Sequence, residues 1–168
     1  MPDRACGGSP ILGGGDVTPV LRVATVADIA AMHRVRLSVR ENRLVFSIIS
    51  ENDYRKHLEE LGRGWVVETA GEIIGLAIGN ATDGNVWALF VHPDHERRGH
   101  GRQLHDVMVS WLWEQGIPKL WLTTDPDTRA RRFYEAAGWS IEGFTSGGQA
   151  LLELRESQRF GYGERTAE

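Results

Sequence analysis

The chain has 168 residues, of which 41% are hydrophobic and 25% are charged, a composition typical of one soluble globular domain. A formal net charge of −4 argues against a nucleic-acid binder, which normally presents a basic face, and no apolar run approaches the ~18 residues that span a membrane. Cys6 is the only cysteine, which excludes an intrachain disulfide and a cysteine-rich zinc site. These features, and an N-terminus without a secretory pattern, predict a cytoplasmic protein with no nucleic-acid or membrane partner.

The first part of the chain predicts one strand followed by two helices. Residues 1–19 are rich in glycine, so we expect a flexible leader there. Residues 20–24 have the composition of a strand. Two Thr/Ser-x-x-Asp capping patterns, which begin at Thr25 and Ser50, predict helices over 26–38 and 51–61.

The second part predicts a meander of strands and then an alternation of helices and strands. Apolar runs at 64–70, 72–79 and 85–91 are separated by turn signals, as in antiparallel strands. Apolar residues then recur at helical spacing from Leu104 to Leu112, and Gly116 ends that helix. The remaining predicted elements are a strand at 119–124, a short helix ending at Gly138, a hairpin of strands at 139–145 and 150–156, and a polar tail at 157–168.

The element order predicts the fold class. A strand, a helix and another strand between residues 85 and 124 predict a local parallel pair, because the helix returns the chain to the same end of the sheet. The other neighbouring strands are joined by short turns and are expected to be antiparallel. We therefore expect an α+β domain over residues 20–156, with a mostly antiparallel mixed sheet flanked by helices.

The stretch VHPDHERRGHGRQL, residues 91–104, joins a predicted strand to a predicted helix. The first amides of a helix lack partners inside the helix and lie at the positive end of its dipole. Gly99 and Gly101 allow the backbone to bend and a ligand to approach, and Arg97, Arg98 and Arg102 add positive charge. This combination favours an anion cradle that suits a diphosphate, although a tight turn with solvated arginines fits the same residues.

Two motifs, VHPDHERRGHGR at residues 91–102 and DTRARRFYEAAGW at residues 127–139, resemble those of the GCN5-related N-acetyltransferase (GNAT) family. The family signature Gln/Arg-x-x-Gly-x-Gly/Ala follows Val-x-Pro at a strand-to-helix turn, and a second signature, Asn-x-x-Ala-x-x-x-Tyr, precedes Gly-Phe. This chain departs from them at Glu96, in place of Gln or Arg, and at Asp127, in place of Asn. The matching residues are Val91, Pro93, Gly99 and Gly101 in the first motif and Ala130, Tyr134, Gly138 and Trp139 in the second.

The resemblance implies an acetyl-CoA-dependent N-acetyltransferase in which the fourth and fifth strands are splayed apart. A neutral primary amine would attack the thioester directly, and Tyr134 would act as the acid for the leaving thiolate. Members of the family are often homodimers, so the same association is implied here by analogy. The cofactor-binding residues implied are Leu89, Phe90, Val91, Arg97, Arg98, Gly99, His100, Gly101, Arg102 and Asp127.

The acceptor and the general base are less closely specified by the sequence. Arg36, Arg40 and Asn42 lie where relatives admit the acceptor and could hold a carboxylate-bearing amine, although a solvated polar loop fits them equally well. This slightly favours a small or amino-acid-like acceptor over a protein. Glu68 and Trp87 are further candidates for contact with the acceptor. The candidate bases are Glu68, Glu41, Asp125 and His92, with a chain of water molecules as the alternative.

The same residues raise three other interpretations. The spacing of His100 and His105 does not match the i, i+4 geometry of a helical zinc site, so we expect no metal. A non-catalytic acyl-CoA binding module would keep the cradle without a base. A phosphoprotein or nucleic-acid binder would use the arginines of residues 97–102, and its binding would weaken steeply with salt.

Overall fold

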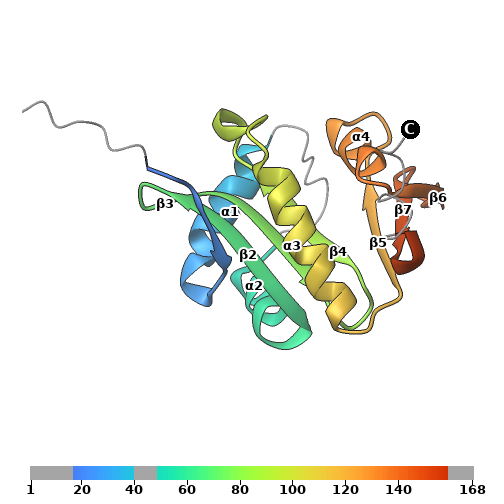
Figure 1. Ribbon diagram of the computed structural model, residues 1–168, viewed down its shortest axis with the longest axis horizontal. Helices are drawn as coiled ribbons and strands as arrows, with labels where there is room; N and C mark the ends of the chain where they lie inside the picture. The colour runs from blue at the N-terminus through green and yellow to red at the C-terminus, as the bar shows by residue number, and fades with distance from the viewer. Residues whose placement is uncertain (1–16, 40–48, 159–168) are drawn as a thin grey trace, which may run out of the picture.

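The computed structural model describes residues 17–39 and 49–158, which form two antiparallel sheets with helices around them (Figure 1). The first sheet has the strand order β1-β2-β3-β4, and the second has the order β5-β7-β6. The strands of the first sheet are β1 (Val20–Val23), β2 (Gly62–Thr69), β3 (Glu72–Asn80) and β4 (Val86–Val91). Those of the second are β5 (Lys119–Thr124), β6 (Ser140–Phe144) and β7 (Ala150–Arg155).

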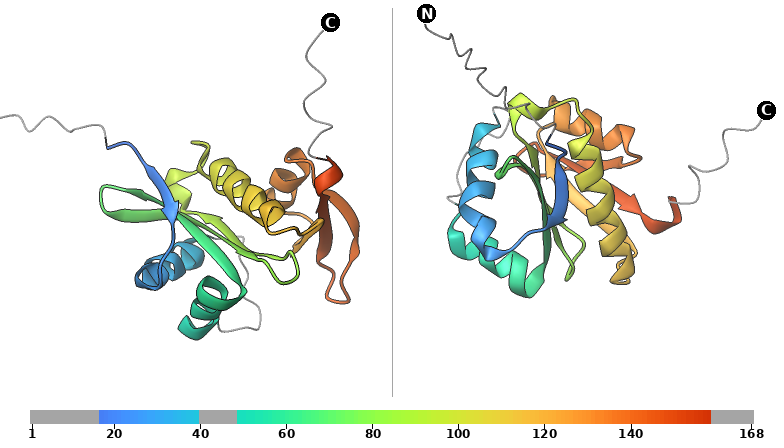
Figure 2. Two further views of the ribbon diagram at one scale, coloured as in Figure 1. Left: turned by 60° about the horizontal axis from the view of Figure 1, so that its bottom comes forward. Right: turned by 60° about the vertical axis from the view of Figure 1, so that its left-hand side comes forward.

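Helices cover both faces of the first sheet. In Figure 2, α1 and α2 lie on one face and α3 lies on the other. Shorter turns flank them, and the segment after α2 is a π-helix, which replaces part of the α-helix predicted over 51–61. The helices and helical turns are η1 (Val26–Asp28), α1 (Ile29–Ser38), α2 (Glu51–Lys56), η2 (His57–Leu61), η3 (Pro93–His95), α3 (His100–Glu114) and α4 (Arg129–Ala136).

Both predicted capping patterns form. The hydroxyl of Ser50 accepts a hydrogen bond from the amide of Asp53 at 3.2 Å, and the Asp53 carboxylate accepts one from the amide of Ser50 at 2.7 Å. At the first helix, the Asp28 carboxylate accepts a bond from the amide of Thr25 at 2.8 Å and forms an ion pair with Arg22 on β1. The first helix therefore begins with a 3₁₀ turn that is anchored to the edge strand.

The first sheet separates two hydrophobic cores. On one face, Met32 and Val35 of α1 and Tyr54 of α2 pack against Val66 and Leu76, all at most 2% exposed. The core on the other face joins α3 to both sheets, with Leu104, Met108 and Leu112 facing Leu120 and Leu152. Each such aliphatic side chain stabilises the fold by roughly 1.5–3 kcal/mol on burial. This second core joins the two sheets through α3.

The predicted parallel pair is present at a single position. Asn85 and Trp121 form an isolated parallel bridge, and the side-chain Nδ2 of Asn85 donates a hydrogen bond to the Trp121 carbonyl at 3.3 Å. Beyond it β4 and β5 pair with different partners, so they separate towards their C-terminal ends. The α+β fold class is thus confirmed, but the expected mixed sheet is divided into two antiparallel sheets that touch through one bridge.

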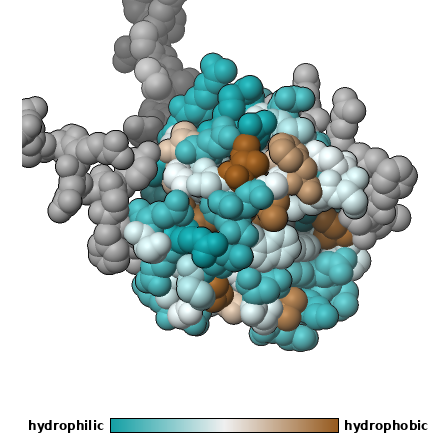
Figure 3. Space-filling view, turned by 90° about the vertical axis from the view of Figure 1, so that its right-hand side faces the viewer, coloured by the Kyte–Doolittle hydropathy of each residue, from teal (hydrophilic) through white to brown (hydrophobic). Residues whose placement is uncertain are grey.

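The surface of the second sheet is mainly hydrophilic. Figure 3 shows this face, on which hydrophobic side chains are scattered among polar ones. Within residues 17–39 and 49–158, no helix is long and apolar enough to cross a membrane. The homodimer implied by the resemblance stays a prediction.

Candidate functional site

A β-bulge in β4 directs Trp87 towards α1 and α2. Ile78 pairs with Ala88 and Gly79 pairs with Val86, so Trp87 is an extra residue without a partner on β3. As a result, Trp87 joins the same hydrophobic cluster as Ala88, its neighbour in sequence, although successive residues of a regular strand point to opposite faces. The bulge lies next to the bridge at Asn85, where β4 begins to leave β5.

The edge of β4 that faces β5 borders a cavity of about 1020 Å³. His92 donates its amide to the carbonyl of Ile74 on β3 at 2.8 Å. Because backbone groups alternate between the two edges of a strand, those of Phe90 also face β3, and those of Leu89 and Val91 face the cavity. The predicted binding edge is therefore available to an extended ligand.

The loop between β4 and α3 contains two residues in the left-handed conformation, with φ of 61° at Arg97 and 84° at Gly99. A non-glycine residue held there costs on the order of 1–3 kcal/mol, and such strain is concentrated at binding sites. Gly99 caps the N-terminus of α3, and residues 99–102 all line the cavity. The unpaired amides and the dipole of a 15-residue helix thus face the cavity, as an anion site requires.

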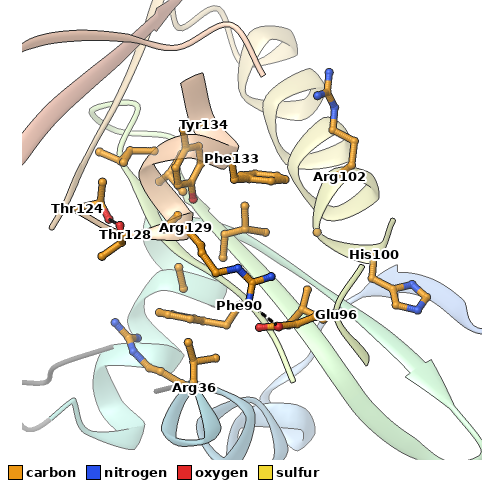
Figure 4. A pocket seen from close by; sticks show the side chains of 18 of the residues that line it. Arg36, Phe90, Glu96, His100, Arg102, Thr124, Thr128, Arg129, Phe133 and Tyr134 are labelled. Carbon is orange, nitrogen blue, oxygen red and sulfur yellow. Dashed lines mark hydrogen bonds and ion pairs between the residues drawn. The ribbon is translucent and has the colours of Figure 1, made fainter. Parts of the chain in front are cut away.

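An ion pair crosses the cavity at this end. Glu96 follows η3 on the side of β4, and Arg129 is the first residue of α4 on the side of β5. The guanidinium Nη1 of Arg129 lies 2.8 Å from Oε2 of Glu96, as Figure 4 shows. Glu96, the first departure from the family signature, is therefore balanced by a positive charge.

Tyr134 projects from α4 into the same cavity (Figure 4). Its ring makes edge contacts with Phe133 and Trp139, with centroids 5.3 Å and 5.4 Å apart, and only 6% of the residue is exposed. Burial raises the pKa of the hydroxyl well above its ordinary value of 10.0. The phenol therefore keeps its proton at neutral pH and can donate it in a hydrogen bond.

His105 connects α3 to the residues behind Tyr134. The indole nitrogen of Trp139 donates to Nε2 of His105 at 2.9 Å, so the proton of the neutral ring is on Nδ1, which donates to Asp106 at 2.8 Å. Burial lowers the pKa of His105, although Asp106 acts in the opposite direction. The neutral imidazole fixes the aromatic cluster that surrounds Tyr134.

Arg36 lies at another part of the cavity, beside Phe90 and apart from Arg102 (Figure 4). It belongs to the last turn of α1 and is 7% exposed. Its guanidinium carbon is 4.9 Å from the ring centroid of Trp87 and 5.1 Å from that of Phe90. Arg36 also forms a hydrogen bond with Tyr54, whose pKa is raised by burial. The cation is thus held rigidly among aromatic rings at the cavity wall.

Most of the predicted site residues that the structure describes line this one cavity. They come from α1, β4, the loop before α3, the first turn of α3, and α4. Asp125, one of the predicted bases, also lines it, at the end of β5. The residues concerned are Arg36, Trp87, Leu89, Phe90, Val91, Arg97, Gly99, His100, Gly101, Arg102, Asp125 and Tyr134.

Four predicted residues do not line the cavity. Arg98 and Asp127 are exposed elsewhere on their loops, and His92 instead caps η3 by accepting a hydrogen bond from the Asp94 amide. The prediction that Glu68 contacts the acceptor or acts as the base is corrected. Glu68 lies on β2, which β3 separates from β4, and it pairs with Arg22 at 2.9 Å. Arg40, Glu41 and Asn42 lie outside the described residues.

Two residues that line the cavity were not predicted from the sequence. Arg129 follows a helix cap within the second motif, and the charge at the start of the helix was a signal that could have identified it. Thr128 caps α4 by accepting from the Arg131 amide at 3.3 Å, and it lines the cavity in place of Asp127. Among the residues with a described position, no three His, Cys, Asp or Glu side chains are grouped so that they could hold a metal ion.

Solved structures of acetyltransferases share this fold. The PaiA N-acetyltransferase of Thermoplasma acidophilum, in complex with coenzyme A, matches 82% of this chain and 99% of its own with a TM-score of 0.70 and 16% identity. The ribosomal-protein-S18-alanine N-acetyltransferase of Escherichia coli matches 82% of this chain and 94% of its own, with a TM-score of 0.67 and 19% identity. At these identities the likeness establishes the fold.

Sequence comparisons extend the likeness to the family. The mycothiol acetyltransferase of Corynebacterium efficiens is 43% identical over 63 residues, which are 35% of this chain and 20% of that protein. This chain thus aligns with only a fifth of the length of that curated relative. The model of the acetyltransferase (GNAT) family matches residues 29–139, which is more than half of the chain and includes both motifs. The chain therefore belongs to the GNAT acetyltransferase family.

Proposed function

We propose that this GNAT-family N-acetyltransferase transfers the acetyl group of acetyl-CoA to the amine of a small acceptor that also carries a carboxylate. One observation carries the proposal. A single cavity between the splayed strands β4 and β5 is lined both by the amides and positive charges at the start of α3 and by the buried cation of Arg36. The first group suits the diphosphate of the cofactor, and the second suits an anionic group on the acceptor.

The residues of the cavity fit acetyl-CoA in charge and in hydrogen-bonding capacity. When bound, the cofactor supplies an acetyl thioester that an amine can attack. The amides of residues 99–102 would hold the diphosphate, and the glycine at position 99 leaves the space in front of the loop open, since an added Cβ meets no atom within 4 Å. Leu89 and Val91 would pair with the amides of the pantetheine arm through backbone groups that face the cavity.

Two groups of this chain then assist the transfer. The amide of Val91 faces the cavity, whereas that of Phe90 faces β3, so of these two residues Val91 is the better donor to the oxyanion that forms on the thioester carbonyl. Tyr134 carries the acid role. Because burial raises its pKa, its Oη holds a proton throughout the neutral range and offers it to the leaving sulfur.

The acceptor amine must lose a proton before it attacks. Of the candidate bases, Asp125 lines the cavity, Glu68 and His92 form contacts elsewhere, and Glu41 is outside the described residues. We assign to Asp125 the removal of this proton, directly or through a water molecule. An alkyl amine has a pKa near 10.4, so a carboxylate is a weak base for it, and turnover should rise with pH.

Arg36 supplies the preference for a carboxylate. A charge that is desolvated among aromatic rings interacts with an opposite charge more strongly than a charge in water does. Because Tyr54, Trp87 and Phe90 hold the guanidinium in place, little side-chain entropy is lost when it binds a ligand. An acceptor with both an amine and a carboxylate would therefore be oriented at Arg36 with its amine free to reach the thioester.

Release of free thiol from acetyl-CoA tests this proposal. Matched pairs of acceptors, each an amino acid and the amine obtained by removing its carboxylate, should differ by roughly tenfold or more in kcat/KM, in favour of the amino acid. In Arg36→Gln this preference should vanish, while affinity for coenzyme A is kept. Arg34→Gln is the matched control, because Arg34 lies on the same helix and is exposed.

Two results would contradict the proposal in different ways. Equal kcat/KM within each pair, in an active enzyme, would remove Arg36 as the acceptor anchor. Tight binding of coenzyme A without turnover on any amine would indicate a non-catalytic binding module. Thermal unfolding of Arg36→Lys, which keeps the charge, separates a loss of fold from a loss of recognition.

A further inference from the structure

The ion pair between Glu96 and Arg129 crosses the cavity beside the loop that cradles the diphosphate. Glu96 immediately precedes Arg97, which is in the left-handed conformation, and lies three residues before the N-cap of α3. Its carboxylate is therefore attached to the same loop as the amides that would bind an anion. A carboxylate at this position opposes the binding of a diphosphate unless its charge is compensated.

Arg129 provides that compensation from the opposite wall. It is the first residue of α4, and Nη1 lies 2.8 Å from Oε2 of Glu96. The side chains of Arg129 and Glu96 are 51% and 32% exposed. A pair this exposed contributes only about 0–1 kcal/mol, so a stronger anion can displace the carboxylate.

We propose that Arg129 is a ligand of the cofactor diphosphate and that Glu96 holds it in place until the cofactor binds. A diphosphate brings more negative charge than a carboxylate and offers several oxygens to the planar guanidinium. On binding, Arg129 exchanges Glu96 for the diphosphate. Glu96 then lies beside the bound anion without its former partner, and its charge weakens cofactor binding.

This inference rests on the proposed use of acetyl-CoA, and it predicts the direction in which two substitutions change the affinity for coenzyme A. Removing the negative charge in Glu96→Gln should tighten the binding of coenzyme A by about 3- to 10-fold, because a competing partner and a repulsive charge disappear together. Arg129→Gln should weaken binding by about tenfold or more, because a ligand is lost and Glu96 is left uncompensated. The two variants therefore shift affinity in opposite directions.

A permanent ion pair between Glu96 and Arg129 predicts a different pattern of affinities. If the ion pair persists when the cofactor is bound, removing either partner would loosen the loop in the same way. Glu96→Gln and Arg129→Gln would then weaken binding by similar factors. The direction in which Glu96→Gln changes the affinity for coenzyme A thus distinguishes an exchange of partners from a permanent ion pair.

Isothermal titration calorimetry with coenzyme A measures these affinities without any turnover. Glu135→Gln is the matched control, because it removes a carboxylate from an exposed ion pair, with Arg131, on the same helix and away from the cavity. Dephospho-coenzyme A retains the diphosphate but lacks the 3′-phosphate, and pantetheine lacks both. Tighter binding in Glu96→Gln should be seen with coenzyme A and dephospho-coenzyme A and should be absent with pantetheine.

Each outcome decides between the possibilities. Unchanged or weaker binding of coenzyme A by Glu96→Gln overturns the inference, and so does an effect that disappears with dephospho-coenzyme A, since that would place Arg129 at the 3′-phosphate. If the wild-type protein itself does not bind coenzyme A, the proposed function fails first. Thermal unfolding without ligand verifies that each variant is folded.

Discussion

Replacing Gly99 by alanine separates the effect of the cradle on binding from its effect on folding. Gly99 has a φ of 84°, and an added Cβ would meet no atom within 4 Å. The substitution therefore introduces backbone strain without a clash, and an L-residue in this conformation costs roughly 1–2 kcal/mol. For a domain of this size, that corresponds to a decrease in Tm of about 2–8 °C.

Gly116 provides a control with the same strain. Its φ is 82°, an added Cβ would again meet nothing within 4 Å, and it lies beyond the other end of α3, outside the cavity lining. Gly99→Ala and Gly116→Ala should therefore lower Tm by similar amounts. The methyl group at position 99 would also stand where the diphosphate approaches the amides. Loss of a charge-assisted hydrogen bond there should weaken binding of coenzyme A by about 10- to 100-fold, in Gly99→Ala alone.

Differential scanning fluorimetry without ligand and calorimetric titration with coenzyme A measure the two effects separately. The reasoning fails if Gly99→Ala binds coenzyme A as tightly as Gly116→Ala does, since the diphosphate would then not lie against this loop. A third variant, Gly101→Ala, should keep its affinity. Its Cβ would lie 3.7 Å from Phe133 and Val91, at ordinary contact distance, and the family signature itself accepts alanine there.

Two further predictions concern α4 and the aromatic cluster behind it. Tyr134→Phe should lower kcat by about 100-fold while leaving the Kd for coenzyme A unchanged. Steady-state thiol release measures kcat, and an unaltered kcat in this variant would show that Tyr134 is not the acid. Because burial lowers the pKa of His105, the unfolded chain, whose histidines titrate near 6.5, binds that proton more readily than the folded protein does. The resulting stability is complete above about pH 6.5 and is lost as the pH falls below it. His105→Gln should flatten this dependence in urea titrations between pH 7 and 5, and parallel curves for wild type and variant would contradict the assignment.

The sequence was informative where local chemistry fixes local structure. Ser50 and Asp53 predict a helix start because the two residues satisfy each other's backbone amides, whatever lies around them. The strand-to-helix turn before α3 was equally predictable, since the glycines, the arginines and the change of hydrophobic period coincide there. These elements position the amides of residues 99–102, and hence the part of the site that we propose binds the cofactor.

Local sequence patterns did not predict contacts between residues that lie far apart in the sequence. Glu68 was a reasonable candidate base because it lies on a central strand. However, β2 pairs with β1, and this brings Glu68 to Arg22, which is 46 residues away in sequence and donates a hydrogen bond to its carboxylate. The same limit applies to Arg129. Its charge was visible, but its contact with Glu96 joins the segment before α3 to the start of α4, which only the packing of α4 beside α3 in the core brings together.

The single extra residue at Trp87 explains how β4 contributes both to the surroundings of Arg36 and to the backbone edge at the cavity. Without it, the side chains of β4 would alternate regularly, and Trp87 and Phe90, three residues apart, would lie on opposite faces of the sheet. With it, both rings contact Arg36, while Leu89 and Val91 keep their backbone groups towards the cavity. One bulge thus lets one strand offer both an aromatic support for the cation of Arg36, our proposed anchor of the acceptor, and a polar edge for the proposed cofactor arm. The chemistry of transfer requires these two ligands to meet, and β4 is the element that they would share.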